Sequence, residues 1–158
     1  MLKPAIGISD KNLKAISTML TAVLSDAVIL YMKTRKFHWN VSGESFMEYH
    51  KLFEAQYKQL EEAIDEVAER ISKLGSQTIG TTKEFASMSQ LKESPGKYPS
   101  SIEMVKELLA DHEAVIVQLR KNVDDCDEKF KDTGTADFLT GLMEKEETIA
   151  WTLRRYLD

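Results

Sequence analysis

The feature that most constrains this chain is the distribution of its glycine and proline residues. Only seven glycines and three prolines occur in 158 residues, and most of them fall outside four long segments with recurring apolar side chains. In each segment the apolar residues recur every three or four positions, which places them on one face of an α-helix. The sequence therefore predicts four long amphipathic helices, and no strand pattern or repeat competes with them.

Turn and capping signals separate the four segments. The stretch Asn40–Gly43 (NVSG) breaks the pattern after the first segment, and Gly75 ends the second. Ser100 and Glu103, three residues apart, have the spacing of a capping box before the third. The segments run from Leu13 to the break, from Phe46 to Leu74, from Ile102 to Val123 and from Leu139 to Tyr156.

A long connection, 75–99, joins the second and third segments, whereas the other two connections are short. Within it, TTKEFASMSQL predicts a short helix, because Thr81 and Glu84 have the spacing of another capping box. Four helices with one long crossover describe an all-α, ferritin-like four-helix bundle, with a short extra helix between helices 2 and 3. We expect residues 1–158 to form this single domain.

Composition narrows the classes of function. Cys126 is the only cysteine, so no disulfide forms within one chain, and no leader pattern follows Met1; both features indicate the cytoplasm. The segment Ala15–Met32 is apolar but is interrupted by polar residues, which favours a bundle helix over a membrane span. The formal net charge of -5 argues against general attraction to nucleic acid or anionic membranes.

One stretch, 36–70, carries residues with metal-binding chemistry. His38 falls on the apolar face of the first helix, and four further polar residues lie along nearly the same side of the second helix. At about 100° per residue, these polar residues flank the apolar core face and do not point directly away from it. Imidazole and carboxylate groups together suit iron or zinc, and two carboxylates that can bridge favour a two-metal redox site. The candidate ligands are His38, His50, Glu54, Asp65 and Glu69.

These candidates cannot all bind one ion within one chain. His50 and Glu69 are nineteen residues apart, which is about 30 Å along a helix. However, the pairs 50/69 and 54/65 share one midpoint, between residues 59 and 60. If two copies of the helix pack antiparallel about a two-fold axis at that point, His50 faces the partner's Glu69 and Glu54 faces the partner's Asp65. The spacing therefore predicts two composite sites, each shared by two chains.

The residues that carry this pattern resemble those of a known family. HWNVSG, followed by H-x3-E and D-x3-E, and the late TADFLT at the start of the last helix resemble the DNA-binding proteins from starved cells (Dps), the small ferritins. The resemblance covers nearly the whole chain. It implies ferroxidase ligands at His38, His50 and Glu54 of one subunit and at Asp65 and Glu69 of its two-fold mate. The family usually has Asp at position 54, and we expect the longer Glu54 to substitute.

The resemblance also implies a function and an assembly. Such proteins form a hollow shell of twelve subunits, oxidise Fe(II), typically with hydrogen peroxide, and store ferric mineral inside. We therefore expect iron as the metal, with zinc as a substitute. Trp39 matches a tryptophan beside the family's site, where it is either an oxidisable sink for radicals or a packing residue. The family's acidic three-fold pores map onto Asp132 and Asp137.

Two other functions remain as alternatives at this point. The family name refers to compaction of DNA, but members that condense DNA commonly use lysine-rich tails. This chain has only Lys3 before Lys11 and ends at Asp158, so we expect weak or absent DNA binding. A redox-inert zinc site would use the same ligands. His112 lies within an apolar stripe and is interpreted as structural.

Overall fold

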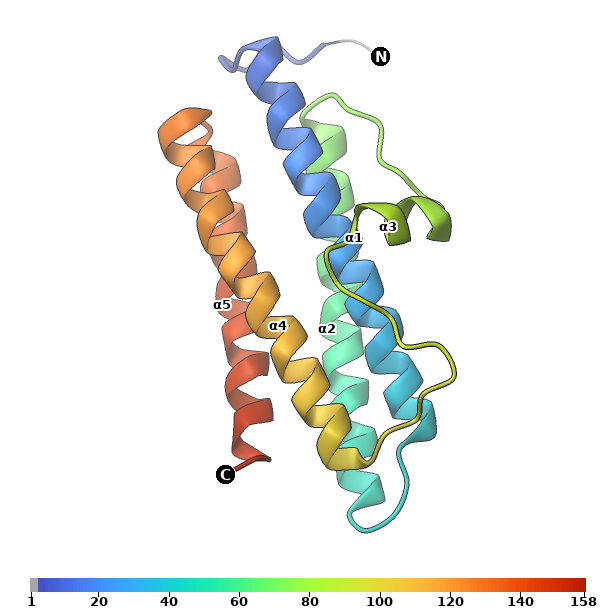
Figure 1. Cartoon of the computed structure of the whole chain (residues 1–158). Coiled ribbons are helices and arrows are strands. Elements are labelled where there is room, and N and C mark those ends of the chain that lie inside the picture. Colours follow the sequence, from blue (N-terminus) through green and yellow to red (C-terminus); the bar gives the residue numbers. More distant parts are fainter. Residues whose placement is uncertain (1–2) are drawn as a thin grey trace.

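Four long helices carry most of the chain, which confirms the predicted fold class. A computed structural model describes residues 3–158, in which five α-helices and one π-helical turn occur and no strand (Figure 1). The elements are α1 (Asp10–Asn40), α2 (Phe46–Lys73), α3 (Thr82–Met88), α4 (Ser101–Asp124), η1 (Asp125–Lys129) and α5 (Thr133–Arg155).

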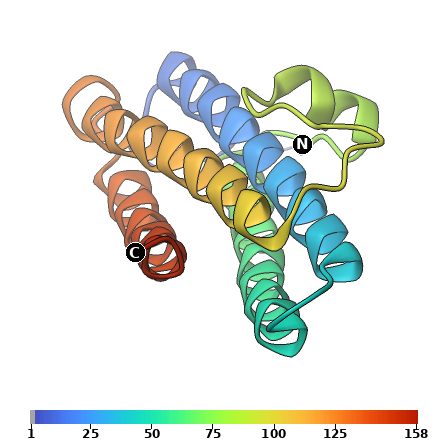
Figure 2. The ribbon, with the colours of Figure 1, turned by 60° about the horizontal axis from the view of Figure 1, so that its bottom comes forward.

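The long helices form two antiparallel pairs. α1 packs mainly on α2 and α4 packs mainly on α5, while α4 also contacts α1 between the pairs (Figure 2). The crossover 75–100 runs along the outside of α1 and returns the chain to the end of the bundle where α4 begins (Figure 1). The predicted short helix α3 lies within this crossover. This topology places the C-terminal end of α1 directly beside the N-terminal half of α2.

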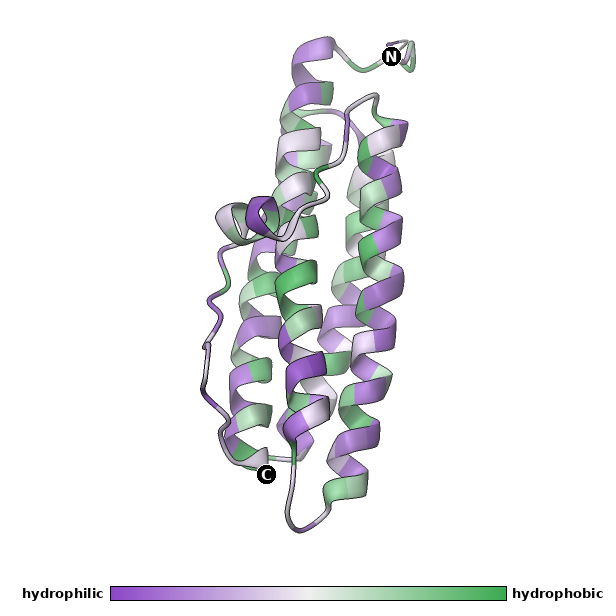
Figure 3. Ribbon diagram, turned by 90° about the vertical axis from the view of Figure 1, so that its right-hand side faces the viewer, coloured by the Kyte–Doolittle hydropathy of each residue, from purple (hydrophilic) through white to green (hydrophobic). Residues whose placement is uncertain are grey.

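The apolar stripes of the helices meet in one core. Large side chains from each of the four long helices, such as Leu20, Phe53, Leu108 and Leu139, have no exposed surface. Polar residues occupy the outer faces, so apolar and polar segments alternate along every long helix (Figure 3). Burial of an apolar side chain of this size contributes about 1.5–3 kcal/mol, so the core is the main favourable term in folding.

α1 has the length and composition of a membrane-spanning helix. Its most apolar window has a mean hydropathy of 1.7, and half of that window is buried inside the bundle. Ile16 and Leu30 have no exposed surface. A core helix of a bundle has the same composition, which agrees with the interpretation made from the sequence.

Capping explains where the crossover and α4 acquire helical structure. Thr81 and Glu84 form the predicted capping box at the start of α3, each side chain accepting an N–H from the other residue. At α4 the box is only half formed. The Ser100 hydroxyl accepts the Glu103 N–H, but the Glu103 carboxylate pairs with Lys106 Nζ at 2.7 Å instead of turning back. A hydroxyl alone satisfies the N-terminal N–H, so α4 still begins where predicted.

A buried ion cluster fastens α1 to α4. Lys33 Nζ lies 2.6 Å from Asp111 Oδ2 and 3.1 Å from Glu107 Oε1, and the Lys33 side chain is only 6% exposed. Burial raises the pKa of the Asp111 carboxyl above its ordinary value, against the opposing effect of Lys33. Removing the Lys33 ammonium should therefore leave two carboxylates without a counter-ion where they are poorly hydrated.

We expect Lys33→Met to lower the free energy of unfolding by about 3 kcal/mol near pH 7. Adding Asp111→Leu should recover most of that loss, because the uncompensated charge is then removed. Without Lys33 the folded-state pKa of Asp111 rises further above its unfolded value, so the folded chain gains a proton first as pH falls. The loss should therefore shrink as pH falls below 7.

Urea unfolding at matched protein concentration measures these differences. Lys106→Met is the matched control, because both members of its pair with Glu103 are more than half exposed and such pairs contribute about 0–1 kcal/mol. Equal losses for Lys33→Met and Lys106→Met would contradict the account of the buried cluster.

Candidate metal centre

His38 and His50 are joined by two reciprocal hydrogen bonds. His38 Nδ1 lies 2.8 Å from the His50 carbonyl oxygen, and His50 Nδ1 lies 2.9 Å from the His38 carbonyl oxygen. A carbonyl only accepts, so each Nδ1 carries the proton and each Nε2 keeps its lone pair. The two rings stack with centroids 3.8 Å apart and planes inclined by 19°. Both imidazoles are thus held in the tautomer that binds a metal through Nε2.

The α1–α2 turn makes this arrangement possible. The chain leaves α1 at Val41, whose N–H binds the Phe37 carbonyl at 2.8 Å. Gly43 then takes a left-handed conformation with φ of +94°, which costs glycine little because it has no Cβ. Ser45 is also left-handed, at φ of 60°. Two left-handed residues reverse the chain within five positions and bring His50 back onto His38.

Glu54 lies one helical turn beyond His50 on α2. Its carboxylate accepts a hydrogen bond from Lys58 Nζ at 2.5 Å, and its side chain is 37% exposed. The Lys58 ammonium lowers the pKa of Glu54, and the nearby imidazoles act in the same direction more weakly. Glu54 is therefore ionised at neutral pH, and its partner is an exposed lysine, in a kind of ion pair that contributes little to stability.

Asp65 and Glu69 lie toward the other end of α2, away from the two histidines. Both are exposed, and Glu69 Oε2 pairs with Lys73 Nζ at 2.9 Å. Within residues 3–158, no three His, Cys, Asp or Glu side chains come together closely enough to hold a metal ion. One chain therefore brings His38 and His50 into contact and leaves Glu54 one helical turn away, bonded to Lys58, while Asp65 and Glu69 lie apart from all three.

Aromatic residues surround the histidines, and sequence reasoning did not identify most of them. The Tyr57 ring stands edge-on to His38 at 5.2 Å and is almost fully buried. The Arg35 guanidinium lies between Tyr57 and Trp39, 4.6 and 5.2 Å from the ring centroids. Tyr31, Arg35 and Trp39 are spaced by four residues on α1, which is the signal that could have revealed this cluster.

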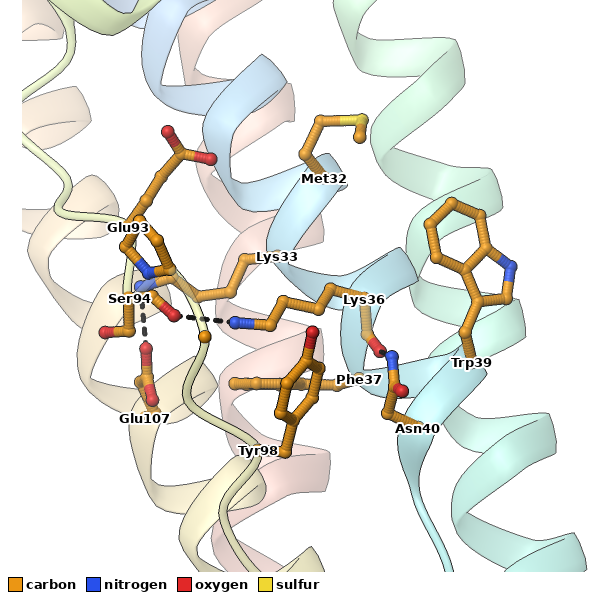
Figure 4. A pocket seen from close by; sticks show the side chains of 12 residues that line it. Met32, Lys33, Lys36, Phe37, Trp39, Asn40, Glu93, Ser94, Tyr98 and Glu107 are labelled. Atoms are coloured by element: carbon orange, nitrogen blue, oxygen red, sulfur yellow. Dashed lines mark hydrogen bonds and ion pairs between the residues drawn. The ribbon is translucent and has the colours of Figure 1, made fainter.

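A pocket of about 410 Å³ opens on the outer side of α1, against the crossover. Figure 4 shows Trp39 on the α2 side of α1, whereas Lys36 and Tyr98 stand on the crossover side. Lys36 Nζ binds the Ser94 carbonyl at 2.7 Å and lies 5.0 Å above the Tyr98 ring. No histidine lines this pocket, so it is distinct from the candidate metal centre.

The two pore candidates occupy different environments. Asp132 is buried, and its carboxylate accepts hydrogen bonds from the Thr135 N–H at 3.0 Å and from Arg70 Nη2 at 3.4 Å. It therefore serves as the N-cap of α5 and ties α2 to α5. Asp137 is exposed, in a depression that also contains Asp124 and Asp127. Of these two pore candidates, only Asp137 has the exposure that a channel requires within one chain.

Two further groups are enclosed in the bundle. His112 has no exposed surface and hydrogen-bonds Glu146 through Nδ1, so its partner comes from α5 and not from its own helix. Burial raises the pKa of the Cys126 thiol to about 12, with a smaller contribution from Asp132. That thiol therefore stays protonated at physiological pH.

Comparison with known proteins identifies the family. The sequence matches the family described as Ferritin-like domain over residues 18–158. The chain is 33% identical over 146 residues to DNA protection during starvation protein 2 of Bacillus anthracis, covering 92% of this chain and 98% of that one. This chain belongs to the ferritin-like family and is a Dps protein. Its likeness to a low temperature-induced protein of Nostoc is higher, at 44% over 153 residues, covering 97% of this chain and 86% of that one.

The folds agree as well. A Dps protein of Vibrio cholerae, described as a member of a superfamily of ferritin-like diiron-carboxylate proteins, superposes with a TM-score of 0.93 at 26% identity. That alignment covers 100% of this chain and 98% of the other. A Dps protein of Bacillus brevis superposes with a TM-score of 0.89 at 30% identity, covering 96% and 100% of the two chains. Membership in this family supports iron storage and stress protection as the general role.

The environments of Asp132 and Asp137 generate a prediction. Asp132→Ala should lower the free energy of unfolding by about 2 kcal/mol, because it removes a cap and leaves buried donors unpaired. Asp137→Ala should leave unfolding unchanged and slow the uptake of Fe(II). Thermal unfolding and stopped-flow iron oxidation measure the two effects. An Asp132→Ala protein as stable as the wild type would contradict the capping role.

Proposed function

We propose that this protein oxidises Fe(II), with hydrogen peroxide as the oxidant, at di-iron sites shared between two subunits, and stores the ferric product in a hollow shell. The observation that carries the proposal is the division of ligands on α2. His50 and Glu54 lie near the start of α2, where His50 contacts His38 of α1, and these three residues supply one proposed half-site. Asp65 and Glu69 lie toward the opposite end of α2. The shared midpoint between residues 59 and 60 supports an antiparallel two-fold mate that supplies the missing half.

The donor set fits Fe(II) as a substrate. Each half-site from one chain offers imidazole nitrogens in the metal-binding tautomer and an ionised Glu54, and the partner adds two carboxylates. Imidazole and carboxylate also bind zinc, so zinc is expected to compete for the site. Two ferrous ions supply the two electrons that reduce one peroxide to two waters, with uptake of two protons. This stoichiometry leaves no hydroxyl radical.

Lysines hold the carboxylates until a cation arrives. Glu54 pairs with Lys58 and Glu69 pairs with Lys73, each four residues further along the exposed face of α2. Exposed pairs of this kind contribute about 0–1 kcal/mol, so their replacement by a divalent ion costs little. The lysines also keep like charges from repelling one another in the empty interface.

We expect a closed shell of twelve subunits built from these two-fold dimers, in the cytoplasm. The shared site makes the dimer the smallest active unit, because one chain contributes to two sites and completes neither. Asp137 and the neighbouring exposed carboxylates provide an acidic entrance for Fe(II) where subunits meet.

Mixing two inactive variants tests the shared site. His50→Ala and Asp65→Ala each damage both sites of a homodimer, so both should oxidise iron slowly. When the two are unfolded and reassembled together, a mixed dimer collects both lesions in one site and leaves the other site intact. Random pairing makes about half of the dimers mixed, so roughly a quarter of wild-type activity should return.

The control is a mixture of His50→Ala with Glu54→Ala, whose lesions lie in the same half-site. Every site in that mixture keeps one lesion, so activity should stay at the baseline. Peroxide-driven iron oxidation that stays at baseline in the first mixture, despite verified mixed assembly, would overturn the shared site.

Binding and compaction of DNA is the alternative function, and one relative is named a DNA protection during starvation protein. The net charge of -5 per chain opposes attraction to a polyanion. We therefore expect no mobility shift of duplex DNA by sub-micromolar protein at physiological ionic strength without divalent metal. A clear shift under those conditions would favour the alternative.

A further inference from the structure

Arg35 lies at the centre of the aromatic cluster beside the candidate metal centre. Its guanidinium carbon is 4.6 Å from the Tyr57 ring centroid, 5.2 Å from that of Trp39 and 5.4 Å from that of Tyr31. Nη1 also donates a hydrogen bond of 2.5 Å to the Tyr31 hydroxyl. One cation therefore faces three electron-rich rings.

Two of the rings that Arg35 contacts adjoin His38, one in space and one in the sequence. Tyr57 stands edge-on to the His38 imidazole at 5.2 Å, and Trp39 follows His38 directly in the sequence. Indole and phenol are also among the side chains that lose an electron most easily. An oxidant that escapes from the site therefore has two easily oxidised rings beside His38 as targets.

No carboxylate pairs directly with Arg35 within the part of the chain that is described. Between residues 3 and 158 it forms no ion pair. Its side-chain hydrogen bond goes to the Tyr31 hydroxyl and raises the pKa of Arg35, and the more distant Glu61 carboxylate adds a weak contribution in the same direction. Arginine also remains protonated at every physiological pH. A fixed positive charge thus stays within contact distance of both rings.

We propose that Arg35 protects Trp39 and Tyr57 from one-electron oxidation by hydroxyl radical that escapes from the iron site. A stray reaction of one ferrous ion with peroxide yields ferric ion, hydroxide and hydroxyl radical. If the indole then gives one electron to the hydroxyl radical, the products are hydroxide and an indole radical cation. That new positive charge lies against the guanidinium, so Coulomb repulsion disfavours the electron loss.

This inference rests on the proposed function, because iron and peroxide supply the oxidant. It also bears on Trp39, which the sequence leaves between a radical sink and a packing residue. A cation over the ring makes Trp39 a poor sink and a good structural anchor. Arg35 is accordingly a positioning residue that acts through the rings, and it touches neither iron nor peroxide.

The chain contains an internal reference. Trp151 is 55% exposed and Trp39 is 59% exposed, so their access to a small solute is similar in one chain. Among residues 3–158, the cation–π contacts to tryptophan involve Trp39 only. Acrylamide quenching of each single-tryptophan variant measures whether this access stays similar in the assembled protein. With similar quenching, a difference in oxidation between the two indoles reports on Arg35 and not on exposure.

The first experiment uses metal-free assembled protein with one tryptophan, obtained as Trp39→Phe or Trp151→Phe. Azide radical generated by pulse radiolysis removes one electron from indole, and the indolyl absorbance gives the rate. We expect Trp39 to be oxidised about tenfold more slowly than Trp151. Arg35→Gln, in the Trp151→Phe background, should remove most of this difference, and Arg35→Lys should restore it because the charge returns.

Acrylamide quenching of tryptophan fluorescence shows whether the Arg35 variants change access to Trp39. Similar quenching with unequal oxidation supports the charge effect. Equal Trp39 oxidation rates in wild type and Arg35→Gln would overturn the proposal, as would equal rates in Arg35→Gln and Arg35→Lys. If Arg35→Gln does not assemble, the wild-type comparison of Trp39 with Trp151 decides, and equal rates overturn it.

The second experiment adds ferrous iron and hydrogen peroxide to wild type and Arg35→Gln, followed by peptide mass spectrometry. Oxidised Trp39 and Tyr57 should increase several-fold in Arg35→Gln, with Trp151 unchanged. No iron oxidation in the wild type would count against the proposed function, whereas the metal-free rates would still decide the role of Arg35. Unchanged Trp39 and Tyr57 oxidation beside normal iron oxidation would overturn the role of Arg35 alone.

Discussion

The two hydrogen bonds exchanged by His38 and His50 hold together the part of the chain on which the chemistry depends. Each imidazole binds the main chain of the opposite helix through Nδ1, at 2.8 and 2.9 Å, so the free nitrogen is Nε2 in both rings. The orientation is set before any metal arrives, which lowers the entropy cost of binding. The same bonds fix the register of α1 against α2, because they require the tight turn through Gly43 and Ser45. The backbone conformation of this turn therefore determines how the two imidazoles are oriented.

α2 links the fold to the proposed assembly. Its N-terminal half carries His50 and Glu54 against the end of α1, and its C-terminal half carries Asp65 and Glu69 on an exposed surface. Helical geometry separates the two halves by more than any metal coordination distance. A chain with this arrangement can complete a two-metal site only by association. On the proposed function, the length of α2 couples activity to assembly, and on the further proposal the charge of Arg35 shields the neighbouring rings.

The helices were predictable from the sequence because each signal was local. Apolar periodicity gave the four long helices, and the spacing of Thr81 and Glu84 gave α3. Contacts between distant residues were not predictable. No spacing rule indicates that Asp132 turns inward to bind Arg70, 62 residues away, or that His112 meets a carboxylate from α5. The π-helical turn η1 likewise depends on packing between α4 and α5 and has no simple sequence signal. The sequence proposed the candidate ligands as a set, and the coordinates were needed to find their hydrogen-bond partners.

The most direct test of the shared site is a crystal structure of the assembled protein soaked with Fe(II) without oxidant, with anomalous diffraction at the iron edge. The account predicts anomalous peaks bound by Nε2 of His38 and His50 and by Glu54 of one subunit, together with Asp65 and Glu69 of its two-fold mate. Zinc soaking under the same conditions should mark the same position. Iron bound by ligands from one chain only, or an interface that leaves Asp65 and Glu69 distant from the histidines of the neighbouring subunit, would contradict it.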